Sequence, residues 1–292
     1  MLSELLMIVV GGLKMGAIYS LTAIGIVVIH KATRTVNFAH GAFVLCGAYV
    51  TYGIVEVLQF GWWAAFVLAS LAGGLLAAVV ELGILRPIRQ ADSFAVITAT
   101  IFIGIGISDI YRLLQNTEIL AVRSMIRGAP LFIGDAMITR EQIAVVGGAM
   151  AVALIGVALF AYAKFGRGMR AMASNPRGAV LCGYSSDAMN ALAWFVGGAM
   201  AGVAGSFAAP STGVTAELSV AMVTAGFAAA VIGGFDSLRG ALLGGLILGV
   251  CETLAAGYVS SAMKNAVSFL LIFIILLWRP QGLFPEAKIR HV

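Results

Sequence analysis

Long stretches without charged residues constrain this sequence more than any other feature. Each stretch is mostly apolar, and a helix that crosses the hydrocarbon core of a membrane needs about 20 such residues. The sequence therefore predicts an integral membrane protein with about nine transmembrane segments, within a range of eight to ten. The first is expected to begin near Leu5, which places Lys14 within or beside it. The stretches are residues 15–30, 38–55, 57–80, 93–108, 142–163, 188–216, 218–235, 241–263 (interrupted by Glu252) and 265–278.

The apolar residues run continuously within each stretch, whereas strands of a membrane barrel alternate polar and apolar residues. The segments are therefore expected to be helices, and the fold an all-α polytopic bundle. Because no long linker separates the stretches, residues 1–292 are expected to form a single transmembrane domain. Glycines four residues apart let helix backbones approach closely in a membrane. Such pairs are Gly12 and Gly16, Gly198 and Gly202, Gly240 and Gly244, and Gly245 and Gly249.

Composition excludes a water-soluble globular protein. Only 11% of the 292 residues are charged, against about 25% in soluble domains, and 61% are hydrophobic. We interpret Cys46, Cys182 and Cys251 as small buried side chains, because they lie far apart among apolar or small residues. The net charge of +5 does not indicate nucleic-acid binding, because the basic residues are spread between the apolar stretches.

The basic residues instead predict the orientation in the membrane, because loops rich in lysine and arginine stay in the cytoplasm. With nine segments, the loops alternate between two sets that carry twelve and five basic residues. We expect the richer set to be cytoplasmic, with the amino terminus outside and the carboxyl terminus inside. The richer set contains Lys31, Arg34, Arg86, Arg89, Lys164, Arg167, Arg170, Arg177, Arg239, Arg279, Lys288 and Arg290, and the other set contains Arg112, Arg123, Arg127, Arg140 and Lys264.

No enzymatic motif is found in the sequence. The phosphate-binding GxxxxGK[ST] loop, the HExxH zinc motif and the GxSxG nucleophile motif are all absent. The three histidines, His30, His40 and His291, have no nearby carboxylates with which to form a metal site. We therefore expect a protein that is not an enzyme and binds no cofactor or metal itself, so that a gradient or a partner must supply any energy it uses.

The loop of residues 164–187 carries the clearest local signals. Ser174 and Asn175 are typical helix caps, Pro176 suits a first helical turn, and Gly183 suits a left-handed helix end. These signals predict a helix of about two turns outside the membrane that presents residues 179–181. A second cap is expected at Ser186 and Asp187. A short capped helix on the membrane surface is typical of a docking element for a soluble partner, although positive-inside composition alone would explain the arginines.

The same loop resembles that of a known family. Residues 170–184 follow the pattern RAxAxNPxxAxLxGY, which is similar to the cytoplasmic loop of permease subunits of ATP-binding-cassette importers for branched-chain amino acids. Further matches, in family order between about residue 12 and 284, are VNFAHG at 36–41, Glu81 followed by RPIR at 86–89, GGFDSLRGA at 233–241 followed by Gly244 and Gly245, and RPQGLF at 279–284.

The resemblance implies a multi-pass protein of the bacterial or archaeal cytoplasmic (inner) membrane that works as an importer subunit. Its partners would be a second permease, paralogous or identical, two ATP-binding subunits that bind ATP and Mg, and a periplasmic or lipid-anchored substrate-binding protein. The loop of residues 164–187 would then couple the permease to the ATPase, through Arg170, Asn175, Pro176, Leu181 and Gly183.

Polar side chains at membrane depth usually face the bundle interior or water, and six of them are candidates for a path or gate. We favour structural hydrogen bonds over substrate contact for Asn37 and His40. The hydroxyls of Thr98, Thr100 and Thr224 are more often returned to their own helix than offered to a solute. Glu252 lies deep in its segment without a basic residue nearby, so it requires a partner from another helix or a wet cavity. Ion pairs are expected from Glu81 to Arg86 and Arg89, and from Asp109 to Arg112.

The sequence is compatible with other substrates and is weighed against two other classes of membrane protein. The chain departs from the family pattern at Leu82, Tyr184, Asp236 and Arg239, which leaves room for urea, short amides or aromatic carboxylates as substrates. A self-sufficient ion-coupled carrier or channel would use Asp109 and Glu252 as coupling carboxylates. A lipid-modifying membrane enzyme would need a nucleophile and base or a metal site, and the sequence indicates neither.

Overall fold

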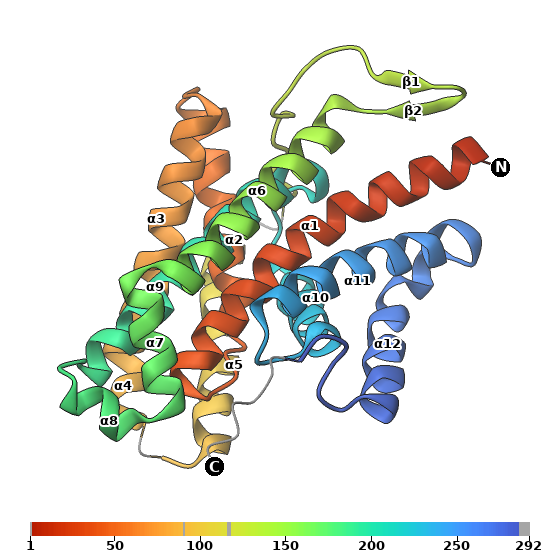
Figure 1. The fold of residues 1–292 in the computed structure, drawn as a ribbon. Coiled ribbons are helices and arrows are strands. Elements are labelled where there is room, and N and C mark those ends of the chain that lie inside the picture. Colours follow the sequence, from red (N-terminus) through yellow and green to blue (C-terminus); the bar gives the residue numbers. More distant parts are fainter. Residues whose placement is uncertain (1, 90, 116–117, 286–292) are drawn as a thin grey trace.

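The computed structural model describes residues 2–89, 91–115 and 118–285 (Figure 1). Lys288, Arg290 and His291, considered above, lie outside these residues. The chain is almost entirely helical. Its helices are α1 (Leu2–Thr33), α2 (His40–Tyr52), α3 (Trp62–Val80), α4 (Arg86–Ile88), α5 (Ser93–Gln115), α6 (Arg140–Tyr162), α7 (Lys164–Ser174), α8 (Pro176–Leu181), α9 (Ser186–Thr212), α10 (Glu217–Gly233), α11 (Leu238–Tyr258) and α12 (Lys264–Trp278).

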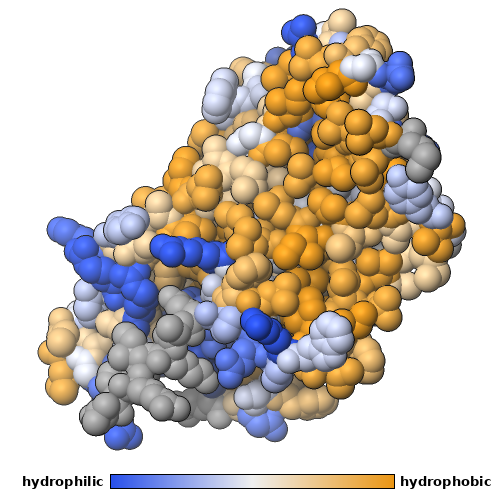
Figure 2. Space-filling view, turned by 45° about the vertical axis from the view of Figure 1, so that its right-hand side comes forward, coloured by the Kyte–Doolittle hydropathy of each residue, from blue (hydrophilic) through white to orange (hydrophobic). Residues whose placement is uncertain are grey.

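Seven helices of the described chain are long and apolar enough to cross a membrane. They begin at Leu2, His40, Trp62, Ser93, Arg140, Ser186 and Leu238. Two of them pass through π-helical turns, η1 (Gly53–Val57) after α2 and η2 (Glu81–Leu85) between α3 and α4. Two shorter apolar helices, Glu217–Gly233 and Ala266–Trp278, complete the nine predicted segments. The predicted helical bundle is confirmed, and Figure 2 shows one broad apolar face with hydrophilic residues gathered at its ends.

Helix α1 lies at the centre of the bundle and packs against α6, α9, α10 and α11. Its predicted glycines are contact points, because a Cβ atom on Gly249 of α11 would lie only 2.3 Å from the Gly16 nitrogen. Helices α3 and α9 touch in the same way, since a Cβ on Gly202 would lie 2.1 Å from the Ala69 carbonyl oxygen. In lipid, close backbone contact of this kind supplies the dispersion energy that hydrophobic burial cannot.

The loops divide between two ends of the bundle. Helices α4, α7 and α8 lie at one end, whereas a small hairpin of β1 (Leu131–Ile133) and β2 (Ala136–Ile138) lies at the other (Figure 1). The hairpin was not predicted and is an addition to the all-α expectation. We call the first end the basic end, formed by residues 31–39, 86–89, 91–92, 163–185, 234–237 and 279–285. Contacts from Arg34 to Asp236 and Ala173, and from Arg89 to Asp187, join these loops.

Candidate functional site

The helical hairpin α7–α8 is the most prominent feature of the basic end. The Asn175 side chain accepts a hydrogen bond from the Gly178 N–H over 3.0 Å, and Pro176 occupies the first turn of α8. Gly183 has a φ of +88°, so the chain leaves α8 through a left-handed residue. The predicted short capped helix is thereby confirmed. The next cap, however, is Ser185, whose hydroxyl accepts from the Ala188 N–H, so the prediction of Ser186 and Asp187 was wrong by one position.

Helix α8 presents a small apolar surface. Leu181 is 89% exposed and Val180 is 52% exposed, whereas Ala179 is buried, contrary to the expectation that all three would be presented. Cys182, expected to be buried, is also exposed. Leu181 is the last residue of α8, and a leucine this exposed contributes little packing within the described chain, so its surface is free to contact a partner.

Arg170 faces the opposite way, toward the bundle. Its guanidinium donates a hydrogen bond to the carbonyl oxygen of Phe160 at the end of α6 and lies 5.8 Å from the centre of that ring. Lys31, at the end of α1, lies 5.4 Å from the same ring. Arg170 therefore anchors α7 to the Phe160 segment of α6, which makes it a support of the hairpin rather than a free contact. The sequence did not indicate that the glycine-rich segment before Asn175 forms the helix α7.

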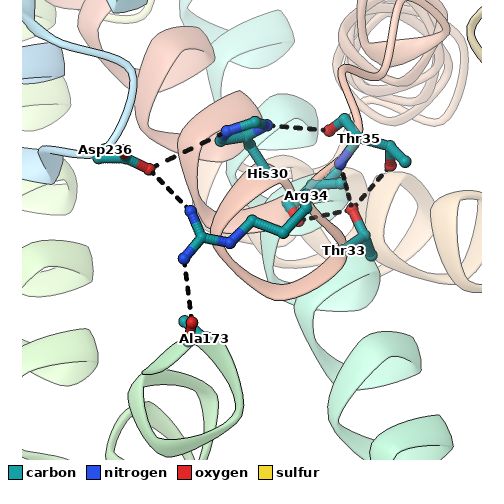
Figure 3. Close-up of polar contacts among 7 residues, drawn as sticks. His30, Thr33, Arg34, Thr35, Ala173 and Asp236 are labelled. Carbon is teal, nitrogen blue, oxygen red and sulfur yellow. Dashed lines mark hydrogen bonds and ion pairs between the residues drawn. The ribbon is translucent and has the colours of Figure 1, made fainter. Parts of the chain in front are cut away.

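Ion pairs join the elements that surround the hairpin at the basic end, and Arg34 also donates a hydrogen bond to the hairpin itself. Arg86 pairs with the buried Glu81 over 3.4 Å, as predicted. Arg89 pairs with Asp187 at the start of α9 instead of Glu81, and Arg86 also donates to the Asp187 carbonyl oxygen over 3.2 Å. On the other side of α7, Arg34 reaches both Ala173 and Asp236 (Figure 3). These contacts involve three arginines, Arg34, Arg86 and Arg89, and three carboxylates, Glu81, Asp187 and Asp236. The charges within this network of six residues therefore balance.

A cavity of about 1120 Å³ lies between α1, α5, α10, α11 and α12. Side chains such as Ile101, Ile105, Val220 and Met222 make most of its wall apolar. One carboxylate, Glu252, lines it while being only 2% exposed. The polar residues Tyr19, Ser108, Ser219, Thr224 and Ser268 also line this main cavity.

Glu252 has the interhelical partners that its position requires. The Tyr19 hydroxyl of α1 donates to Oε2 over 2.9 Å, and the Ser268 hydroxyl of α12 donates to Oε1. Within the described part of the chain, no lysine or arginine forms an ion pair with this carboxylate. Hydroxyl donors on both oxygens let a carboxyl group stay buried without a counter-ion. The prediction that Glu252 requires a partner from another helix or a wet cavity is confirmed in its first alternative, with donors on α1 and α12.

Charged residues gather at the rim of the main cavity. Arg112 lies 3.5 Å from Asp109, confirming the predicted pair, and 3.4 Å from Glu217 at the start of α10. All three line the cavity and are substantially exposed. Sequence reasoning missed Glu217 as a member of this cluster, and it also missed Tyr19 and Ser268, because each meets its partner only through tertiary packing.

Of the other candidate path residues, Thr224 lines the main cavity, whereas Asn37, His40, Thr98 and Thr100 are not among its lining residues. Thr224 returns its hydroxyl to the Val220 carbonyl oxygen over 2.8 Å, as is common in helices. Thr100 accepts from the Phe38 N–H over 3.2 Å and donates to the Ile97 carbonyl oxygen, which ties α5 to the turn before α2. Thr98, on the same helix, is half-buried.

Asn37 and His40 are packed into the junction of α1, α2 and α9. Asn37 Oδ1 accepts from the Ala39 N–H over 2.9 Å, which stabilises the turn into α2. The ring of His40 is fully buried against Gly25, where a Cβ atom would lie 2.7 Å from ring atoms. Neither ring nitrogen meets hydrogen-bond geometry with any residue that the structure describes.

Comparison with known proteins gives the following matches. Residues 8–276 match the family model described as "Branched-chain amino acid transport system / permease component". The chain is 31% identical to the high-affinity branched-chain amino acid transport system permease protein LivH of Escherichia coli K12, over 96% of both chains. It is 28% identical to BraD of Pseudomonas aeruginosa, a permease protein of the same description, over 97% of this chain and 96% of BraD. It is also 24% identical to the permease protein LivM of Salmonella typhimurium, over 94% of this chain and 69% of LivM.

Proposed function

Since this chain belongs to the family of permease components of branched-chain amino acid transport systems, we propose that it forms the translocation path of an ATP-driven importer for branched-chain or other hydrophobic amino acids. The observation that carries the proposal is the main cavity, an apolar space of about 1120 Å³ within a multi-pass helical bundle. Aliphatic side chains gain free energy on entering such a space, at roughly 25 cal/mol per Å² of apolar surface. The charged rim formed by Asp109, Arg112 and Glu217 is suited to the ammonium and carboxylate groups of an amino acid.

The proposal assigns the two ends of the bundle to the two sides of the membrane. The basic end faces the cytoplasm, because loops rich in lysine and arginine stay there. This places the amino terminus outside and the carboxyl terminus inside. The charged rim then opens toward the side on which a substrate-binding protein delivers the amino acid.

The partners follow from the same proposal. LivH and LivM are both named as permease proteins of high-affinity branched-chain amino acid transport systems, and this chain is similar to both. We propose that it pairs with a second permease, paralogous or identical. Two separate ATP-binding subunits hold the ATP and Mg, because this chain carries no phosphate-binding loop of its own. They contact the α7–α8 hairpin, where Leu181 offers the exposed apolar contact.

Uptake by proteoliposomes tests this function. The purified chain is reconstituted alone, and also with the second permease, the ATPase subunits and the binding protein. We expect leucine uptake only from the complete assembly and only with ATP. Leu181→Glu, at a surface residue that supports no packing, is expected to abolish stimulated uptake while leaving the thermal stability of the chain unchanged.

Other outcomes identify other functions. Uptake of urea, a short amide or an aromatic carboxylate in place of leucine would keep the importer but change its substrate. Uptake by the chain alone, driven by a proton or sodium gradient and lost in Glu252→Gln, would overturn the importer in favour of a secondary carrier. That second candidate is considered because Glu252 is a buried carboxylate that lines the cavity.

A further inference from the structure

Arg34 occupies an unusual backbone position. Helix α1 ends at Thr33, and the Arg34 N–H bonds to the His30 carbonyl oxygen over 2.8 Å. Arg34 itself has a φ of +56°, in the left-handed region that helix ends normally fill with glycine. A side chain in this conformation strains the backbone. Because the Arg34 side chain is 58% exposed, burial does not compensate for this strain.

The left-handed conformation aims the Arg34 side chain at two other elements. One guanidinium nitrogen lies 3.4 Å from the Asp236 carboxylate in the turn between α10 and α11. The other donates to the carbonyl oxygen of Ala173 over 3.0 Å. Ala173 lies in the last turn of α7, where carbonyl groups lack partners within the helix. Figure 3 shows the guanidinium lying between these two acceptors.

The end of α1 is docked on the same turn by a second contact. The His30 ring lies edge-on to Phe235, with centroids 4.7 Å apart, and its Nε2 lies 4.0 Å from Asp236 Oδ1. Its Nδ1 is 3.3 Å from the Thr35 carbonyl oxygen, which holds the ring in place (Figure 3). Arg34 therefore projects from a fixed point, and its fork joins α7 to the α10–α11 turn.

The elements on the two sides of this link have different positions in the proposed transporter. Helix α7 leads directly into α8, the exposed element at the basic end. Helices α10 and α11 line the main cavity, with Thr224 and Glu252 among their lining residues. We propose that Arg34 is a positioning residue that transmits displacement of the α7–α8 hairpin to α10 and α11, and so couples ATP hydrolysis to opening of the cavity. This inference rests on the function proposed above.

The competing explanation is an incidental surface ion pair, since exposed pairs generally contribute little to stability. The substitution Arg34→Gly separates the two explanations. Glycine relieves the strained backbone, so the fold should be as stable as before or more stable. The link to Ala173 and Asp236 is lost at the same time. A merely structural residue would leave transport unchanged when stability does not fall.

Gln59 provides a matched control. It has a φ of +55° and, with Arg34, is one of the two non-glycine residues with positive φ in the described chain. It lies between α2 and α3, away from the basic end. Gln59→Gly therefore relieves the same backbone strain without touching the link. Arg34→Lys retains the charge but lacks the two-armed guanidinium, so an intermediate effect is expected.

The first measurement is hydrogen exchange in the detergent-purified chain, which requires no partner. Arg34→Gly should increase exchange of amides 171–175 and 234–240, and Gln59→Gly should leave both segments unchanged. Unchanged exchange in Arg34→Gly would overturn the link.

The second measurement is leucine transported per ATP hydrolysed by the reconstituted assembly. Arg34→Gly should lower this ratio by about fivefold or more, the lower limit of typical coupling between sites. Asp236→Asn should lower it less, and Gln59→Gly should leave it unchanged. An unchanged ratio in Arg34→Gly, or an equal fall in Gln59→Gly, would overturn the role of Arg34. An absence of ATP-driven uptake by the wild-type assembly would instead overturn the proposed function, while the exchange result would still decide the link.

Discussion

The main cavity and the basic end satisfy their polar groups in different ways. In the cavity, the buried carboxylate of Glu252 is held by two hydroxyl groups from other helices, and its own helix α11 packs closely against α1 at Gly249 and Gly16. At the basic end, half-exposed arginines are shared among carboxylates and carbonyl groups of several elements. A buried polar group that loses its hydrogen bond costs more free energy than an exposed one, because water cannot replace the lost partner. Exposed ion pairs contribute little to the free energy of unfolding, so losing one at the basic end should destabilise the fold less than losing a buried hydrogen bond in the cavity.

The largest expected effect comes from filling the close contact between α1 and α11, two helices that contribute residues to the cavity lining. Gly249→Val would place carbon against the Gly16 backbone, since a Cβ atom there lies 2.3 Å from the Gly16 nitrogen. We expect the free energy of unfolding to fall by about 3 kcal/mol, as for severe overpacking. Thermal unfolding in detergent measures this loss.

Gly83→Val is the control for that substitution. No described atom lies within 4 Å of a Cβ atom at Gly83, so the expected loss is below about 1 kcal/mol. Equal losses in the two variants would contradict the close packing of α1 against α11 at Gly16 and Gly249.

The next effect concerns the buried carboxylate. Tyr19→Phe removes one donor and leaves Oε2 of Glu252 without that hydrogen bond, which should lower the free energy of unfolding by about 2 kcal/mol. Tyr49→Phe serves as a control, because this hydroxyl is only partly buried and donates to the Tyr111 carbonyl oxygen. A loss no greater at Tyr19 than at Tyr49 would mean that Glu252 does not depend on its hydroxyl donors.

The smallest expected effect is at the cavity rim. Arg112→Gln removes two exposed ion pairs and should change the free energy of unfolding by less than about 0.5 kcal/mol. Under the proposed function, the same substitution should weaken leucine uptake, because the Arg112 charge no longer attracts the carboxylate of the amino acid. Uptake should also become less sensitive to salt, because salt acts by screening that attraction. A stability loss as large as that of Tyr19→Phe would show that the rim is structural.

Local signals in the sequence predicted the parts that depend on neighbouring residues. The cap at Asn175, the first turn at Pro176 and the left-handed Gly183 each follow from backbone preferences over a few positions. The small hairpin also has a local signal in the sequence. Gly134 and Asp135 lie between two apolar triplets, a pattern typical of the tight turn that joins two antiparallel strands.

Contacts between distant residues could be anticipated in kind but not in identity. The sequence indicated that Glu252 needs a partner, yet Tyr19 lies 233 positions away and only the packing of α1 against α11 brings it close. The same holds for the pair of Glu217 with Arg112. It also holds for Arg89, which pairs with Asp187 and not with the predicted Glu81. Helix packing, which sequence periodicity does not specify in apolar segments, decides these pairings.

Accessibility of the cavity during the ATP cycle tests the central claim most directly. Thr224→Cys, in the cavity lining, and Thr98→Cys, outside it, are made in a chain with Cys182 and Cys251 replaced by serine. The rate at which a charged thiol reagent reacts is then measured in the complete assembly, without nucleotide and with ATP trapped by vanadate. The account predicts a several-fold change between the two states at residue 224 and none at residue 98. Equal rates in both states at residue 224 would contradict the assignment of this cavity as the translocation path.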